Sequence, residues 1–235
     1  IMETRSIKIL EINPQDQMDL FFQTKKRKIS PRTQNQKNYF QLLNSKDIVF
    51  AYGPAGTGKT FLAVAKAVAS LQQGLVKKIV LSRPAVEAGE KLGFLPGDLK
   101  EKVDPFLRPI YDALYEMMPY DQVEKKLANN IIEIAPIAFM RGRTLEDCFI
   151  ILDEAQNTTK IQMKMFLTRL GKNSKMVVVG DNTQIDLISK NDSGLIDASK
   201  KLKNIQDIGF IELDQRDVIR HEVVKKIINA YEQKN

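Results

Sequence analysis

The chain has 235 residues, of which 43% are hydrophobic and 28% charged, and its formal net charge is +7. This content suffices for one substantial core, and no stretch approaches the roughly 20 consecutive apolar residues that cross a bilayer. The first residues also lack the pattern of a secretory signal, so we expect a cytoplasmic protein with no membrane association. A single cysteine, Cys148, excludes an internal disulfide, and we expect a buried structural thiol there. The positive charge favours a polyanionic partner without proving one.

One domain is predicted, over residues 33–235, preceded by an N-terminal strand and a basic linker over residues 1–32. Residues 6–12 have the composition of a strand, and residues 25–28 are a basic run that is either an electrostatic footprint for nucleic acid or a solvated linker. Thr33 is placed to cap the helix that follows. This helix would carry Tyr39, Phe40, Leu42 and Leu43.

Beyond residue 45, apolar strands alternate with helical segments. The predicted strands are residues 47–52, 78–82, 131–134, 149–152, 176–179 and 209–213. This rhythm predicts an α/β fold, a mostly parallel sheet covered by helices on both faces. The longest connection, residues 83–130, is predicted to hold a Gly- and Pro-rich loop and a helix around residues 110–118. A final helix is predicted over residues 220–233. Loops at the carboxyl ends of such strands carry function.

A glycine-rich loop lies between the strand at residues 47–52 and a helix-forming run that begins at Phe61. Its residues are Gly53, Pro54, Ala55, Gly56, Thr57, Gly58, Lys59 and Thr60. The glycines permit a backbone that turns successive N–H groups around phosphate oxygens at a helix N-terminus. Lys59 would reach the β- and γ-phosphates, and the Thr60 hydroxyl would bind the accompanying Mg²⁺. The pattern predicts binding of a nucleoside triphosphate.

Two further strands end in polar residues. Asp153 and Glu154 follow the strand at residues 149–152, where Asp153 would help to hold Mg²⁺ and Glu154 would orient and deprotonate the attacking water, which predicts a hydrolase. The alternative is that both acids cap the following helix. Gln184, after the strand at residues 176–179, would sense the γ-phosphate, although this segment also has ordinary turn composition.

These three segments together resemble motifs I, II and III of superfamily 1 helicases. A narrower match is to the PhoH family of phosphate-starvation-associated ATPases. It rests on residues 82–90, 93–97, 140–144 and 218–221. The resemblance extends from about Thr33 to the last residue, and it implies a RecA-like P-loop ATPase core, a homo-oligomer and a connection to RNA metabolism. It also places Gln36 where related helicases read adenine, with Gln34 as a competitor and a solvated helix residue as the alternative. Arg83 falls in the place of motif Ia, which touches the single strand, and a subunit contact or a packed loop are its alternatives.

Superfamily 1 helicases bind ATP between two RecA-like domains, and the second domain supplies arginines that stabilise charge on the γ-phosphate. This chain is predicted to have only one RecA-like domain. The site is therefore either slow and incomplete, or completed by a neighbouring copy in a head-to-tail ring, for which we favour a hexamer. Candidates for this arginine finger are Arg216 and Arg220, followed by Arg141 and Arg143.

The leading functional hypothesis is Mg²⁺-dependent ATP hydrolysis by an oligomer, coupled to RNA or other single-stranded nucleic acid. The alternative is a nucleotide-gated assembly factor that acts on a protein partner and uses hydrolysis as a timer. Strand separation ranks lower, because the sequence shows neither a second motor domain nor a separating pin.

Overall fold

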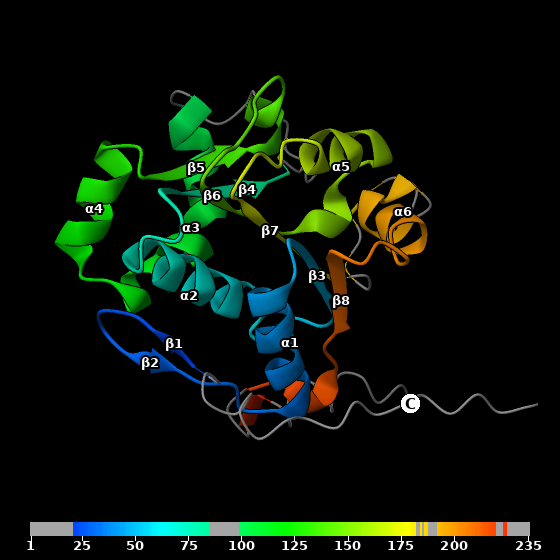
Figure 1. The fold of residues 1–235 in the computed structure, drawn as a ribbon, viewed down its shortest axis with the longest axis horizontal. Helices are drawn as coiled ribbons and strands as arrows, with labels where there is room; N and C mark the ends of the chain where they lie inside the picture. The colour runs from blue at the N-terminus through cyan, green and yellow to red at the C-terminus, as the bar shows by residue number, and fades with distance from the viewer. Residues whose placement is uncertain are drawn as a thin grey trace, which may run out of the picture.

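A six-stranded parallel sheet forms the centre of the computed structural model, which describes residues 21–84, 99–181, 184, 186–187, 192–219 and 223–224 (Figure 1). The strands are β3 (Ile48–Tyr52), β4 (Lys78–Arg83), β5 (Ile132–Pro136), β6 (Cys148–Leu152), β7 (Lys175–Gly180) and β8 (Ile208–Glu212). Their order across the sheet is β5-β4-β6-β7-β3-β8, and every neighbouring pair is parallel. All six strands predicted from the sequence are therefore confirmed, with ends that differ by at most two residues.

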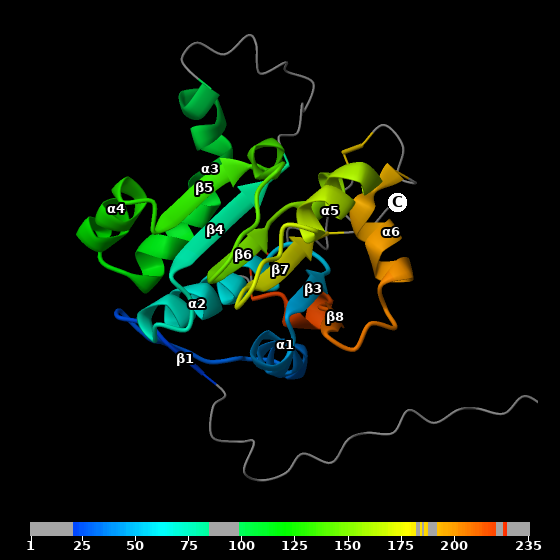
Figure 2. The ribbon, with the colours of Figure 1, turned by 45° about the horizontal axis from the view of Figure 1, so that its top comes forward.

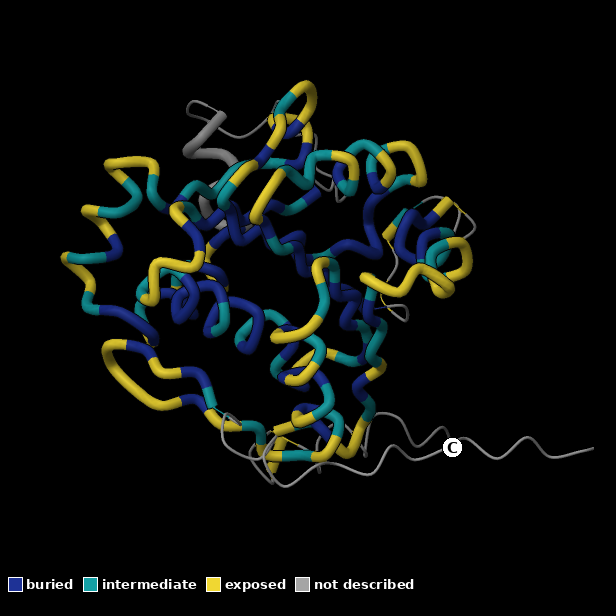
Figure 3. Tube along the Cα trace, in the orientation of Figure 1, coloured by how far each residue is buried: buried dark blue, intermediate teal, exposed yellow. Residues whose placement is uncertain are grey.

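Helices cover both faces of this sheet, as the apolar composition of its strands requires. The helices are α1 (Gln34–Ser45), α2 (Lys59–Gln72), α3 (Leu99–Met117), α4 (Tyr120–Ala128), α5 (Lys160–Leu167) and α6 (Gly194–Lys201). Side chains of α1 to α4 share one core cluster with one face of the strands, while those of α5 and α6 share a second cluster with the opposite face. Buried residues accordingly gather in the central strands and in α2 (Figure 3). Cys148 lies in the second cluster and is buried, as predicted.

The basic run at residues 25–28 lies at the turn of a small hairpin rather than in an isolated linker. Strands β1 (Phe22–Gln23) and β2 (Lys28–Ile29) pair antiparallel, and the Phe22 ring stacks on Phe40 of α1 with centroids 4.0 Å apart. The hairpin is thereby attached to the main core. The predicted domain boundary at residue 32 stays a prediction, and the predicted strand at residues 6–12 lies outside the described residues.

The predicted cap of α1 is confirmed, because the Thr33 hydroxyl accepts a hydrogen bond from the Gln36 backbone N–H at 3.2 Å. The helix predicted around residues 110–118 is also present, but it begins earlier, at Leu99. Of the predicted final helix at residues 220–233, only Val223 and Val224 are described, and both are helical. Within the described part of the chain, no helix combines the length and the apolar character needed to cross a membrane.

Candidate active site

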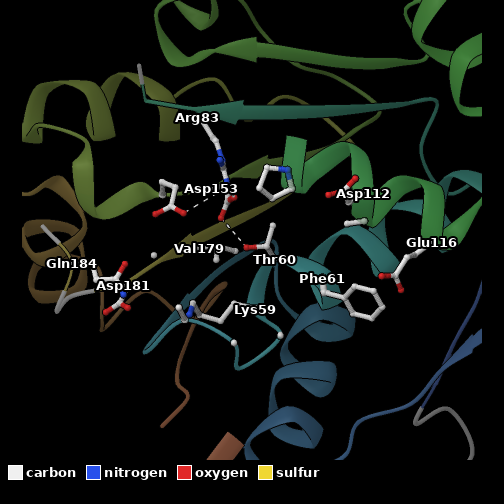
Figure 4. Close-up of a pocket in the computed structure, with 17 residues that line it drawn as sticks. Lys59, Thr60, Phe61, Arg83, Asp112, Glu116, Asp153, Val179, Asp181 and Gln184 are labelled. Atoms are coloured by element: carbon white, nitrogen blue, oxygen red, sulfur yellow. Dashed lines mark hydrogen bonds and ion pairs between the residues drawn. The ribbon is translucent and has the colours of Figure 1, made fainter. Parts of the chain in front are cut away.

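The carboxyl ends of β3, β4, β6 and β7 meet at one edge of the sheet, where Figure 2 shows the arrows pointing to the same side. A pocket of about 450 Å³ lies at this edge (Figure 4). Its lining comprises Ala55, Gly56, Gly58, Lys59, Thr60, Phe61, Arg83, Pro109, Asp112, Ala113, Glu116, Asp153, Glu154, Val179, Gly180, Asp181 and Gln184. The parallel topology thus brings the glycine-rich loop, the two acids after β6 and Gln184 to one cavity.

The glycine-rich loop connects β3 to α2, as predicted. Gly53 has φ +138°, and a Cβ atom there would lie 2.0 Å from the Leu213 carbonyl oxygen, so no larger residue fits. Gly58 has φ +86° and precedes the first turn of α2, which starts at Lys59. Three backbone bonds hold the loop and its neighbours together: Gly53 N to Gly180 O, Leu213 N to Tyr52 O and Ile219 N to Gly56 O. The loop therefore places the N-terminus of α2, with its unpaired N–H groups, at the pocket.

Lys59 is buried, and its ammonium lies within the loop. The Nζ atom donates to the carbonyl oxygens of Gly53 and Pro54, each at 2.7 Å. Burial lowers the pKa of Lys59, while nearby carboxylates, Asp181 first among them, oppose that effect. Phosphate oxygens form stronger, charge-assisted bonds with an ammonium than neutral carbonyls do. The two carbonyl bonds are therefore contacts that a bound phosphate would replace.

Asp153 is 3% exposed and has two partners in the pocket. The Thr60 hydroxyl donates to its Oδ1 at 2.8 Å, and the Arg83 guanidinium donates to its Oδ2 from Nε at 2.9 Å and from Nη2 at 2.5 Å. A hydroxyl and a carboxylate are hard oxygen donors of the kind that Mg²⁺ takes alongside phosphate oxygens and water. The pair Thr60 and Asp153 therefore fits the predicted metal site. Among the described residues, no cluster of three or more His, Cys, Asp or Glu side chains forms an alternative.

Glu154 lies beside Asp153 and also pairs with the Arg83 guanidinium, at 3.6 Å from Nη2 to Oε1, but it is much more exposed than Asp153. Its backbone is left-handed, with φ +53°, and its side chain is 45% exposed. The Gln156 amide donates to Glu154 Oε2 at 2.7 Å and accepts from the Asp181 backbone N–H at 2.9 Å, which ties the ends of β6 and β7 together. Glu154 is the N-cap residue of the short helix η4 (Ala155–Asn157) but makes no side-chain hydrogen bond to it, and the alternative that the two acids cap the helix through its dipole stays open. Glu154 is placed as a partly exposed carboxylate whose orientation the Gln156 amide fixes.

Gln184 also lines the pocket and is exposed, and its backbone N–H donates to the Asp181 carbonyl at 3.2 Å. The structure places it near Lys59 and Asp181 (Figure 4). Its predicted role as a γ-phosphate sensor stays a prediction.

Gln36 is 2% exposed, so the alternative of a solvated helix residue is wrong. Its Nε2 donates to the Thr57 carbonyl at 3.1 Å, and its Oε1 accepts from the Arg32 backbone N–H at 2.8 Å. Gln34 is exposed and bonds Asn38. Gln36 thus contacts the glycine-rich loop directly, and its reading of adenine stays a prediction.

Of the predicted arginine fingers, the three that the structure describes, Arg141, Arg143 and Arg216, do not line the pocket of their own chain. Arg216 is exposed and its guanidinium is held by Asp214, with the closest contact at 2.6 Å. Arg143 donates two bonds to Glu133, whereas Arg141 is exposed. Arg220, like His221, lies outside the described residues. A finger acts on the site of a neighbouring copy, so all four roles stay predictions.

Sequence reasoning missed the part that Arg83 plays in the pocket. It placed Arg83 in a motif that contacts single-stranded nucleic acid in related helicases. In the structure the Arg83 side chain is 15% exposed and pairs with Asp153. The sequence does show a basic residue at the end of a predicted strand, which is a sign that Arg83 could lie at the site. That Asp153 is its partner can be seen only once β4 is known to lie beside β6. Asp112 and Glu116 were missed as well, because α3 reaches the pocket from a distant part of the chain, and so was Phe61 in the first turn of α2.

Residues 28–232 match the family model described as "PhoH-like protein". A PhoH-like protein of Bacillus subtilis (strain 168) is 59% identical over 211 residues, which cover 90% of this chain and 66% of that protein. A PhoH-like protein of Mycobacterium tuberculosis (strain ATCC 25618 / H37Rv) is 59% identical over 86% of this chain and 58% of its own length, and protein PhoH of Escherichia coli (strain K12) is 43% identical with the same coverage. The chain thus spans about three fifths of the length of these relatives. Among solved structures, a Pif1 helicase from Candida albicans is similar with a TM-score of 0.40 and 14% identity, over 84% of this chain and 42% of that one, so this likeness is coarse.

Proposed function

This chain belongs to the PhoH-like family, and from that premise we propose that it hydrolyses ATP with Mg²⁺, as an oligomer, in a manner coupled to RNA or other single-stranded nucleic acid. One observation carries the proposal. A single pocket combines a phosphate-loop lysine, a hydroxyl beside a buried carboxylate and a solvent-facing glutamate.

Each of these residues has a distinct task in the proposed reaction. The N–H groups at the start of α2 and the Lys59 ammonium bind the triphosphate, as two loop carbonyls release that ammonium. Thr60 and Asp153 would hold Mg²⁺, which when bound neutralises charge on the phosphate oxygens. For Asp153 to do this, the Arg83 guanidinium has to give up part of its contact with the carboxylate.

Glu154 is the proposed general base. Its carboxylate is accessible to water, and the Gln156 amide fixes its orientation at 2.7 Å. It would accept the proton of the water molecule that attacks the γ-phosphate. Gln184, at the same end of the pocket, is proposed to contact that phosphate. ATP as the substrate rests on the predicted contact between Gln36 and adenine, and because ATP is an intracellular substrate the proposal implies a cytoplasmic enzyme.

The oligomer and the nucleic acid are the further parts of the proposal. The described residues form one six-stranded sheet with one nucleotide pocket at its edge. We propose that a neighbouring copy supplies a charge-stabilising arginine to this pocket, through a head-to-tail contact of the kind that closes into a ring. The net charge of +7 supports a polyanionic partner. An assembly factor that acts on a protein partner is the alternative, and it differs in being indifferent to RNA.

The test is steady-state ATP hydrolysis by the purified chain, with and without single-stranded RNA. Glu154→Gln keeps the shape of the side chain but removes the base, so we expect turnover to fall by about 10²-fold or more while ATP binding persists. Glu146→Gln, at an exposed glutamate outside the pocket, is the matched control and should retain wild-type turnover. Equal turnover in the Glu154 and Glu146 variants would reject the proposed base. Turnover that RNA leaves unchanged would favour the assembly factor.

A further inference from the structure

The short turn that follows the edge strand β5 presents an aromatic side chain to solvent. This segment, residues 137–144, contains the 3₁₀ helix η3 (Ile137–Met140) and is called the η3 turn below. Phe139 is 53% exposed and is one of the large hydrophobic side chains that are exposed in the described part of the chain. β5 ends at Pro136, which is the register partner of Arg83 on β4. The η3 turn therefore emerges at the functional edge of the sheet, next to the arginine that holds Asp153.

The exposure of Phe139 is not the result of a loosely packed turn. Ile137 and Met140, on either side of it, are 2% and 0% exposed. The Arg143 guanidinium donates to both carboxylate oxygens of Glu133, at 2.6 and 2.9 Å, and Arg169 of the neighbouring α5 region donates to the Arg143 carbonyl at 3.0 Å. The η3 turn is thus fixed to the sheet on one side and to a helix end on the other. Its backbone holds the Phe139 ring in solvent.

The η3 turn also carries the positive charge of Arg141, which pairs with no carboxylate among the residues that the structure describes. Arg141 is exposed and its side chain has no hydrogen bond or ion pair among the described residues. The Arg169 guanidinium donates hydrogen bonds to the backbone oxygens of Met165 and Arg143 and to the Thr168 hydroxyl, and all three acceptor atoms are uncharged. Glu133 is already shared by Arg143 and Lys78, the latter at 2.6 Å. An anionic group that approaches Phe139 would therefore meet an available guanidinium.

We propose that the η3 turn is a binding site for single-stranded nucleic acid, in which a base stacks on Phe139 and a backbone phosphate pairs with Arg141. An exposed aromatic ring and, two residues later in the same turn, an exposed arginine with no ion pair among the described residues match the two interactions that such strands offer, stacking and charge. A stable protein interface buries about 800 Å² on each partner, far more than one phenylalanine provides. The inference deepens the proposed function and rests on its nucleic-acid arm.

The position of the η3 turn gives the site a route to the nucleotide pocket. A strand bound at Phe139 and Arg141 would contact the end of β5, whose neighbour on β4 is Arg83. Arg83 in turn bonds Asp153. A shift of the end of β5 on binding would therefore move Arg83 and change its contact with Asp153, the carboxylate that is proposed to hold Mg²⁺.

The experiment is a fluorescence anisotropy titration of a labelled oligouridylate of about 16 nucleotides, the upper end of known site sizes. The full chain is used with Mg²⁺ and a non-hydrolysable ATP analogue. Phe139→Ala should weaken binding by roughly 5- to 100-fold, the loss of one stacked base, while Phe139→Tyr should retain it. Arg141→Ala should weaken binding and lower the slope of log affinity against log salt by about one. Tyr120→Ala, at a 65% exposed aromatic residue of α4, and Lys126→Ala are the matched controls and should bind as wild type.

Hydrolysis without RNA and the mass of the oligomer are measured on the same preparations. Unchanged binding in both Phe139→Ala and Arg141→Ala would overturn the site while the proposed function stands. A wild-type chain that hydrolyses ATP but does not bind the oligouridylate would also overturn it. An altered oligomer mass with unaltered RNA binding would make the η3 turn a subunit contact instead and reject the proposal. Failure of the wild type to bind or hydrolyse ATP would reject the proposed function itself.

Discussion

The Arg83 guanidinium is the principal counter-charge of the buried Asp153 carboxylate in this structure. Removing it by Arg83→Ala leaves that carboxylate with a hydroxyl partner alone. Breaking a buried ion pair from one side costs about 3 kcal/mol, so we expect the nucleotide-free protein to lose about that much unfolding free energy. Urea denaturation measures the change.

Asp153→Asn and the double variant complete the test of this pair. Because the double variant leaves no uncompensated charge, it should be more stable than the sum of the two single changes predicts. Additive effects would show that Arg83 and Asp153 are not coupled in solution.

Individual site residues could be predicted when their chemistry lies within one short segment. Lys59, Thr60, Asp153 and Glu154 belong to segments whose residue types and spacing already suggest phosphate and Mg²⁺, and the structure brings them into one pocket. Arg83 needed the knowledge that β4 lies beside β6, because its partner is distant in sequence. Phe61 directly follows the glycine-rich loop, but its residue type gives no indication that it lines the pocket.

At the scale of elements, the ion pair that anchors the η3 turn to β5 predicts a pH dependence. Hydrogen bonds from Arg143, followed by those from Lys78, hold the pKa of Glu133 at about 2, against the raising effect of burial. A lowered pKa in the folded state adds stability at every pH above the ordinary value of 4.5. This contribution decreases as the pH falls below that value and is lost as the pH passes through about 2.

Glu133→Gln removes this contribution. Solvent screening reduces its size, so we expect a loss of about 1 to 2 kcal/mol near neutral pH. The difference in unfolding free energy between the variant and the wild type should shrink between pH 4.5 and about 2. Glu146→Gln, at an exposed glutamate with no ion pair among the described residues, should show no such trend. A constant difference over this pH range would contradict the anchoring role of Glu133.

The elements that alternate strongly in hydropathy were predicted best. All six sheet strands were found because each is rich in apolar residues and lies between polar segments, although the edge strands β5 and β8 are mostly half-buried. The β1 and β2 strands were missed, since two residues each are too few to show a period and the basic run between them resembles a linker. The start of α3 was placed too late, because Pro105 and Pro109 interrupt its pattern.

At the scale of the whole molecule, the predicted ring requires that one copy completes the site of the next. Glu154→Gln lacks the base and Arg220→Ala lacks the predicted finger, so each variant alone should be inactive. In an equal mixture, about a quarter of the head-to-tail contacts would join an intact base to an intact finger, and hydrolysis should recover to about that fraction. The measurement is ATP hydrolysis of the mixture, with light scattering to report the oligomer mass, for which we expect a hexamer.

Arg216→Ala mixed with Glu154→Gln is the parallel experiment for the second candidate finger. A mixture that stays inactive although the subunits exchange would contradict a finger supplied by a neighbour. Activity of Arg220→Ala on its own would remove that residue as the finger.

The contacts that hold the glycine-rich loop have a consequence for the protein during its synthesis. Gly53 contacts Leu213 and bonds Gly180, and Gly56 bonds Ile219. A ribosome that adds about 5 to 20 residues per second reaches Leu213 roughly 10 to 30 s after Gly53. Until then the nascent chain carries the complete motif without Leu213 and Ile219, two of the residues whose backbone holds the loop. A stalled fragment that ends before β8 would therefore lack these two contacts to the glycine-rich loop.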